Sequence, residues 1–144
     1  MSNQKYAAYA NAEAYFGLVR EALGVEVDGA HFFDVVAEQI TYEVRYDVAG
    51  WPRVIRGCED LMAQFAGYCE HIKLVRVDNL ISHKSETGDV VIIEYDVHGE
   101  ILATGVIYEN RFCSIIKIEN RKIAHWRDYM DSLAAWNALT ARAG

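Results

Sequence analysis

The second half of the chain consists of strand-length segments in which apolar and polar residues alternate. Between residues 91 and 98 every odd position is apolar, whereas the even positions include Glu94, Asp96 and His98. A period of two is the spacing of a β-strand that has one apolar and one polar face. Residues 123–131 show the same alternation. The second half is therefore predicted to be rich in β-strands.

Four strands are predicted in this half of the chain. They cover residues 73–82, 90–98, 101–118 and 122–131, and the third is either one long strand or a bulged pair. The short segment 119–121 reads as a tight turn. Because neighbouring strands joined by short turns run in opposite directions, the last three strands should form an antiparallel meander.

The first half has helical spacing instead. Apolar residues recur at intervals of three and four over residues 6–23 and 59–71, which predicts two amphipathic helices. A shorter helix is predicted over residues 28–37, a strand over 40–46, and a final helix over 132–141. Helices followed by a mostly antiparallel sheet define an α+β fold.

Composition favours one domain over residues 1–144. A chain of 144 residues fits a single compact unit, 52% of it is hydrophobic, and a single proline interrupts it. No segment has the composition of a linker. The three cysteines are widely spaced and odd in number, so they are expected to be reduced and to hold no zinc.

Charge and hydropathy exclude several partners. The net charge of −7 has the wrong sign for a protein that binds a phosphate backbone, so nucleic acid is not expected as a partner. No run is long and apolar enough for a membrane span, and the first residues lack the apolar stretch of a secretory signal. The protein is therefore expected in the cytoplasm, away from membranes.

Asp128 is the most informative residue for chemistry. It shares one face of the last predicted strand with Ala124, Trp126 and Met130. In a dry apolar site the pKa of a carboxyl group rises, which would make Asp128 a general acid or base near neutral pH. A salt bridge to an arginine such as Arg111 would lower the pKa instead, and the sequence leaves both alternatives open.

The acidic face of residues 91–98 also has two interpretations. It is either solvated, as in many antiparallel sheets, or turned toward a cavity. The motifs of nucleophilic hydrolases, nucleotide-binding loops, zinc proteases and calcium loops are absent from the sequence. We therefore expect neither a metal nor an organic cofactor.

The order of elements and two short motifs resemble a known superfamily. The motifs are Glu94-Tyr-Asp-Val-His-Gly99 and Trp126-Arg-Asp-Tyr129, and the resemblance spans residues 12–135. The chain is similar to the SnoaL-like and ketosteroid-isomerase-like proteins of the nuclear transport factor two fold. This resemblance implies a cone-shaped domain, a cystatin-like roll in which a strongly curved sheet and three N-terminal helices wrap around a pocket. It also implies a dimer that pairs through the sheet.

Local similarity to limonene epoxide hydrolase suggests roles for individual residues. The Asp of its Trp-Arg-Asp-Tyr segment activates water and falls on Asp128. The Asp of its Arg-x-Asp motif matches Asp96, but Glu94 occupies the place of the Arg. A Tyr on its first strand matches Tyr42, whereas Val44 replaces the accompanying Asn. Ketosteroid isomerases and polyketide cyclases use a similar logic, in which one acid abstracts a proton and a neutral acid or Tyr donates to the enolate oxygen.

These observations predict an acid/base enzyme that acts on a small, largely apolar, oxygenated molecule. Asp128 would be the principal acid/base, paired with Asp96, and the reaction would be isomerisation, cyclisation, dehydration or epoxide hydration. The alternative is a non-catalytic ligand carrier or a dimeric interaction domain of the same fold. The pocket is predicted to be lined by Tyr42, Glu94, Asp96, Tyr108, Asn110, Trp126 and Asp128.

A homodimer is predicted from the amount of apolar surface on the sheet. The odd positions of residues 91–97, together with Ile107, Cys113 and Ile115, present more apolar area than one short C-terminal helix can cover. Pairing of two sheets would bury that area.

Overall fold

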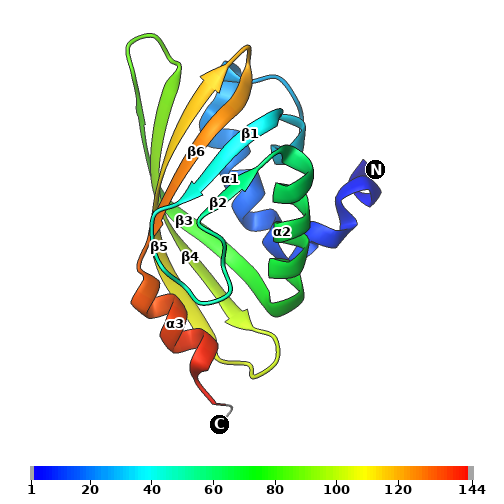
Figure 1. The fold of residues 1–144 in the computed structure, drawn as a ribbon, viewed down its shortest axis with the longest axis vertical. Helices are drawn as coiled ribbons and strands as arrows, with labels where there is room; N and C mark the ends of the chain where they lie inside the picture. The colour runs from blue at the N-terminus through cyan, green and yellow to red at the C-terminus, as the bar shows by residue number, and fades with distance from the viewer. Residues whose placement is uncertain (1, 143–144) are drawn as a thin grey trace.

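One six-stranded sheet organises the molecule (Figure 1). The computed structural model describes residues 2–142. In this part of the chain the strands are β1 (Val36–Val44), β2 (Val54–Arg56), β3 (Ile72–Lys84), β4 (Val90–Ile101), β5 (Ile107–Glu119) and β6 (Lys122–Met130). The α-helices of the same part are α1 (Glu13–Leu23), α2 (Cys58–His71) and α3 (Ser132–Thr140). Single turns of 3-10 helix cover Gly24–Glu26 and Phe32–Asp34, and a kinked 3-10 segment covers Ser2–Ala12.

The strand order is β2-β1-β6-β5-β4-β3. All neighbouring strands are antiparallel except β1 and β6, which run parallel. The predicted meander of the last three strands is confirmed as β4-β5-β6, and the α+β class is confirmed with it. The predicted long strand over 101–118 is divided, because β4 continues to Ile101 and a turn precedes β5.

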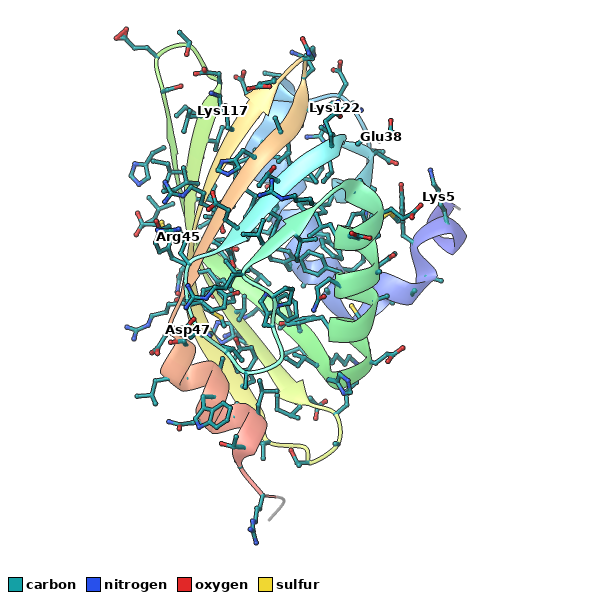
Figure 2. All side chains as sticks on the ribbon, in the orientation of Figure 1. Lys5, Glu38, Arg45, Asp47, Lys117 and Lys122 are labelled. Atoms are coloured by element: carbon teal, nitrogen blue, oxygen red, sulfur yellow. The ribbon has the colours of Figure 1, made fainter. Side chains whose placement is uncertain are left out.

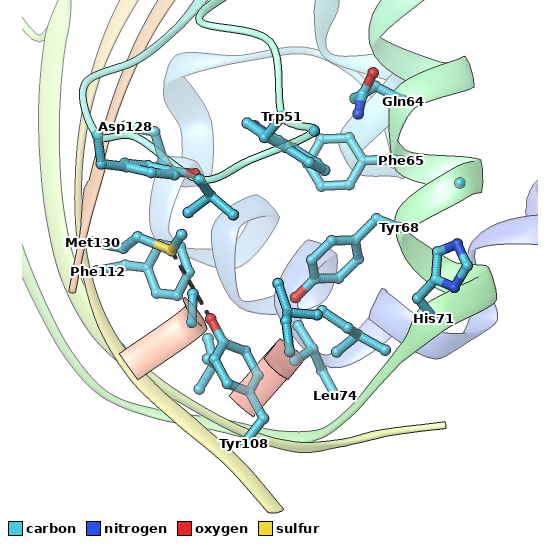
Figure 3. Close-up of a pocket in the computed structure, with 18 of the residues that line it drawn as sticks. Trp51, Gln64, Phe65, Tyr68, His71, Leu74, Tyr108, Phe112, Asp128 and Met130 are labelled. Carbon is cyan, nitrogen blue, oxygen red and sulfur yellow. Dashed lines mark hydrogen bonds between the residues drawn. The ribbon is translucent and has the colours of Figure 1, made fainter. Parts of the chain in front are cut away.

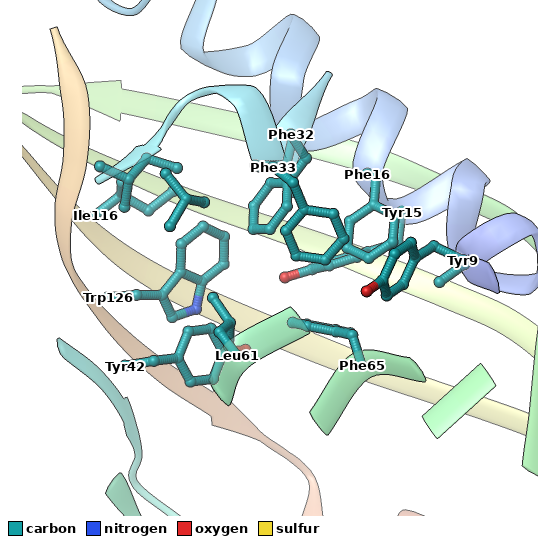
Figure 4. Close-up of a cluster of buried hydrophobic side chains, with 14 of the residues drawn as sticks. Tyr9, Tyr15, Phe16, Phe32, Phe33, Tyr42, Leu61, Phe65, Ile116 and Trp126 are labelled. Carbon is teal, nitrogen blue, oxygen red and sulfur yellow. The ribbon is translucent and has the colours of Figure 1, made fainter. Parts of the chain in front are cut away.

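Helices α1 and α2 lie on the same side of the sheet, and α3 packs against β5 at one end of it (Figure 1). The space between helices and sheet is filled largely by aromatic rings (Figure 4). Trp126 of β6 stacks on Tyr42 of β1 with 5.6 Å between ring centroids, and Phe32 meets the same indole edge-on at 5.8 Å. Charged side chains such as Arg45, Asp47 and Lys117 lie at the surface instead (Figure 2).

Strand β4 shows which face of the sheet is covered. Its odd residues are at most 2% exposed, and they face the helices: Val91, Ile93, Tyr95 and Val97. This corrects the reason for predicting a dimer, since the apolar odd face is the core of one chain and is already covered. The even residues of β4 lie on the outward face.

Two predicted helices differ from the structure. Residues 28–37 form only the 3-10 turn Phe32–Asp34, because Val35 accepts a backbone hydrogen bond from Ile123 (2.7 Å) and Val36 pairs with the same residue of β6. β-branched residues suit this pairing better than a helix. The helix predicted over residues 6–23 is α-helical only from Glu13. The helices predicted over 59–71 and 132–141 are present as α2 and α3.

Gly99 allows β3 to approach β4 where β3 bulges between Leu74 and Arg76. A Cβ atom at position 99 would lie 2.2 Å from the carbonyl oxygen of Lys73. No side chain fits at that distance, so the glycine is required by the bend of the sheet. Within residues 2–142, none of the helices combines the length and the apolar character of a membrane crossing.

Candidate functional site

Asp128 points from β6 into the interior, and only 2% of it is exposed. Its Oδ1 atom accepts hydrogen bonds from Ser114 Oγ at 2.7 Å and from Trp126 Nε1 at 3.0 Å. Ser114 is opposite Asp128 because β5 and β6 pair in that register. The Oδ2 atom has a longer contact of 3.4 Å, from the hydroxyl of Tyr46. One carboxylate oxygen is therefore held firmly, and the other is held loosely.

Burial raises the pKa of Asp128 from its ordinary value of 3.8 to about 6, and the hydrogen bonds from Trp126, Ser114 and Tyr46 oppose that rise. Loss of hydration outweighs these hydrogen bonds because the charged form is disfavoured in an apolar interior. The salt-bridge alternative is wrong. Arg111 lies on the outward face, where its guanidinium is 3.6 Å from the carboxylate of Asp131.

A cavity of about 360 Å³ opens beside Asp128 (Figure 3). Its walls come from α1, β1, α2, β3, β4, β5, β6 and α3 and from the segment that joins β1 to β2. Among the described residues, Asp128 is the only carboxylate in these walls, and neither lysine nor arginine contributes to them. The residues that line it are Tyr15, Tyr42, Tyr46, Val48, Ala49, Gly50, Trp51, Gln64, Phe65, Gly67, Tyr68, His71, Ile72, Leu74, Val97, Tyr108, Phe112, Asp128, Met130, Ala135 and Leu139.

Tyrosine hydroxyls are the main polar groups in the cavity besides Asp128. Burial raises the pKa of Tyr108 to about 12, and it raises the pKa of Tyr42 and Tyr46 as well. The charge of Asp128 adds to each of these shifts, because a second negative charge nearby is unfavourable. These phenols therefore stay protonated at neutral pH and act as hydrogen-bond donors.

Asp96 and Glu94 do not belong to this site, which corrects the predicted pocket. Both lie on the outward face of β4, where Asp96 is opposite Arg111 and accepts a hydrogen bond from Asn79 at 2.7 Å. Glu94 is exposed and contacts His83 at 3.1 Å. Glu94 and Asp96 alternate along β4 with Val97, which lines the cavity, so their side chains point away from Asp128.

The other predicted residues fall into two groups. Tyr42 and Tyr108 line the cavity. Trp126 is fully buried behind it and holds Asp128. Asn110 is also buried, and its amide nitrogen donates to the hydroxyl of Tyr108 at 2.8 Å and to the carbonyl of Asp131 at 3.0 Å. Trp126 and Asn110 therefore support residues at the cavity, but they do not line it.

Three contributions escape the sequence analysis: Ser114, Tyr46 and residues 48–51. Ser114 is a buried polar residue on the inward face of β5, and its hydroxyl also bonds the hydroxyl of the buried Tyr95 at 2.9 Å. Tyr46 continues the alternation of Tyr42 and Val44, and this pattern is a weak indication that its side chain faces the same way as that of Tyr42. Residues 48–51 have no periodicity that could place them.

The described residues contain no group of three or more His, Cys, Asp or Glu side chains arranged to hold a metal ion. Cys58, Cys69 and Cys113 are free thiols. Burial raises the pKa of each of these thiols, which disfavours the reactive thiolate.

Comparison with known proteins agrees with the fold. Residues 19–126 match the SnoaL-like domain family. The chain therefore belongs to the SnoaL-like domain family. In sequence it is 25% identical over 118 residues to the uncharacterised protein YesE of Bacillus subtilis (strain 168), which covers 82% of this chain and 76% of that protein.

Solved structures share the fold at low sequence identity. A putative isomerase from Bacillus subtilis superposes with a TM-score of 0.73 at 20% identity, over 99% of both chains. For an NTF2-like protein from Burkholderia xenovorans LB400 the TM-score is 0.64 at 22% identity, and the match covers 74% of this chain and 79% of that chain. For a putative polyketide cyclase from Pseudomonas putida KT2440 the TM-score is 0.67 at 17% identity, and the match covers 91% of this chain and 92% of that chain. The nuclear-transport-factor-two-like fold predicted from the resemblance is thus confirmed.

Proposed function

We propose that the cavity binds a small, largely apolar, oxygenated molecule and that Asp128 exchanges a proton with it. The observation that carries this proposal is a buried carboxyl group whose pKa is raised to about 6, in the wall of a cavity to which none of the described lysine or arginine side chains contributes. A group with a pKa near the working pH can both take and return a proton. Buried charges without partners are rare in purely structural positions.

The hydrogen bonds of Asp128 indicate which oxygen reacts. Oδ1 already accepts from Ser114 and Trp126, whereas Oδ2 has only the long contact with Tyr46. At pH 7 the carboxyl group is mostly ionised, so Oδ2 is the base. It removes a proton from carbon beside a carbonyl group, and the electrons of the broken C–H bond move to the carbonyl oxygen. A protonated phenol such as that of Tyr42 or Tyr46 would donate to the enolate.

Return of the proton to a different carbon gives isomerisation. Attack of the enolate carbon on a second carbonyl within the molecule gives cyclisation, and loss of a β-hydroxyl group gives dehydration. Epoxide hydration would use the same base on water. The names of two structural relatives, a putative isomerase and a putative polyketide cyclase, favour the carbon-acid reactions.

The proposal is tested by deuterium exchange at the carbons beside the carbonyl of 2-tetralone, a neutral bicyclic ketone, in D₂O. We expect the protein to accelerate exchange above the buffer rate, and Asp128→Asn to reduce that acceleration at least 100-fold, the size of a lost general base. Asp96→Asn is the matched control, because Asp96 lies on the other face of the sheet. Equal exchange by wild type and Asp128→Asn would refute the role of Asp128.

One observation favours the alternative of a ligand carrier. No second ionised carboxylate lines the cavity, whereas the predicted mechanism used two. A carrier would bind 2-tetralone without accelerating exchange. Binding measured by NMR alongside the exchange rate therefore separates the two functions.

We also propose that two copies pair through the outward face of the sheet. In its middle, Ile92 is opposite Ile115, and Cys113 is opposite Tyr129. These four side chains are only half-buried in one chain. Sedimentation at micromolar concentration should give twice the monomer mass, and Ile115→Lys should halve it. A monomeric wild type would contradict this proposal.

A further inference from the structure

The segment between β1 and β2 forms part of the cavity wall. Four consecutive residues, Val48 to Trp51, line the cavity. The segment is closed at its base by a backbone hydrogen bond of 2.8 Å from Val44 to Arg53 and by an ion pair between Asp47 and Arg53. Within it, the backbone N–H of Trp51 donates to Val48 at 3.0 Å. Trp51 is therefore held in place by its own turn.

The indole N–H of Trp51 has no hydrogen-bond acceptor. Its nitrogen is buried, and the only other buried side-chain nitrogen or oxygen without a hydrogen-bond partner among the described residues is Nε of Arg127, which lies 3.9 Å from a carboxylate oxygen of Glu43. The indole of Trp126, by contrast, donates to Asp128. An unsatisfied buried donor costs about 1–3 kcal/mol, so such groups call for an explanation.

No acceptor atom of the described residues makes a hydrogen bond with the Trp51 indole nitrogen, and the cavity beside the ring leaves room for one. The ring meets Tyr68 edge-on at 6.0 Å between centroids. Figure 3 shows it beside Phe65, across the cavity from Asp128 and Met130. An indole nitrogen can only donate, so its partner must bring an acceptor atom. A molecule in the cavity can provide that atom.

The charge of the cavity restricts what this molecule can be. Among the described residues, the walls contain the carboxylate of Asp128 and no lysine or arginine, and their one basic side chain is the imidazole of His71. A carboxylate or phosphate at Trp51 would be buried in a cavity that already holds the charge of Asp128, with no lysine or arginine to neutralise it, which is costly. A neutral carbonyl oxygen accepts one hydrogen bond from an indole without that cost.

We infer that Trp51 is a ligand-binding residue that donates a hydrogen bond to a neutral carbonyl oxygen of the molecule in the cavity. This inference deepens the proposed function. It rests on one part of that proposal, namely that the cavity binds the ligand, and not on proton transfer by Asp128. It narrows the ligand to uncharged carbonyl compounds with an apolar body. It also predicts that Trp51 makes the protein bind a carbonyl compound more tightly than the hydrocarbon of the same shape.

The test compares 2-tetralone with tetralin, which has the same two rings and no oxygen. In protein with ¹⁵N-labelled tryptophan, the indole N–H signal of Trp51 should move downfield with 2-tetralone and stay nearly unchanged with tetralin. Trp51→Phe assigns the signal by its disappearance. That variant should bind 2-tetralone about five- to tenfold more weakly, the effect of one buried hydrogen bond, and should bind tetralin within twofold of wild type. Trp136→Phe, on the exposed side of α3, is the matched control.

An equal loss of affinity for both compounds would overturn the inference, because the indole would then contribute only apolar surface. Failure of 2-tetralone to bind the wild type, or to move the Trp51 signal, would overturn it as well. A different pattern is expected if the inference on Trp51 holds but the proposed role of Asp128 as the base is wrong. In that case 2-tetralone binds and shifts the Trp51 signal, but Asp128→Asn leaves the exchange rate unchanged.

Discussion

The two faces of the sheet treat the same kind of residue in opposite ways. Asp128 on the inward face is 2% exposed and sits among tyrosines, and its pKa is raised to about 6. Asp96 on the outward face is partly exposed and bonds Asn79. Both aspartates occupy strands with the same alternation. The environment behind the strand, more than the strand pattern, decides whether a carboxylate becomes a base.

The largest effect on stability should come from the pH dependence of Asp128. The folded pKa of about 6 exceeds the unfolded value of 3.8, so the carboxyl group contributes stability below pH 4 and loses it as the pH rises through 6. The difference between the folded and the unfolded pKa corresponds to about 3 kcal/mol of unfolding free energy over the whole titration.

Urea unfolding of wild type and Asp128→Asn at several pH values measures this pH dependence of the unfolding free energy. Relative to Asp128→Asn, wild type should lose about 2 kcal/mol of unfolding free energy between pH 4 and pH 7. Asp96→Asn, from the outward face, should not follow this curve. A wild-type curve parallel to that of Asp128→Asn would mean that the carboxyl group of Asp128 is solvated.

A smaller effect on stability is expected from substitutions at two residues of β5 that lie on opposite faces of the sheet. Ser114→Ala removes the 2.7 Å hydrogen bond to Asp128, so the pKa of Asp128 should rise further. At pH 7 this variant should lose about 1–2 kcal/mol of unfolding free energy. Lys117→Ala, at an exposed position on the outward face of the same strand, should change it by less than about 0.5 kcal/mol. Carboxyl NMR titration checks the pKa, and similar losses in both variants would contradict a special role for Ser114.

Much of the fold could be predicted because it depends on local periodicity. The alternation around Asp128 correctly placed that residue beside Trp126, and helical spacing located α2 and α3. Residues 28–37 were misassigned because pairing with Ile123, far along the chain, overrides their helical pattern.

The site was harder to predict because it depends on which strands are neighbours. Alternation shows that Glu94 and Asp96 share a face, but the resemblance to a hydrolase motif turned that face toward the cavity, whereas the apolar face points inward. Ser114 reaches Asp128 only through the register of β5 and β6. Trp51 lies in an irregular segment, where no pattern indicates what its indole meets.

The parallel pairing of β1 with β6 has a consequence for how the protein is made. β1 ends at Val44, but the strand that separates it from β5 begins only at Lys122. During synthesis, the inner edge of β1 therefore stays unpaired until β6 has emerged, and an open strand edge invites pairing with other chains. Nonsense mutations that remove β6 should accordingly yield aggregates instead of a smaller folded domain.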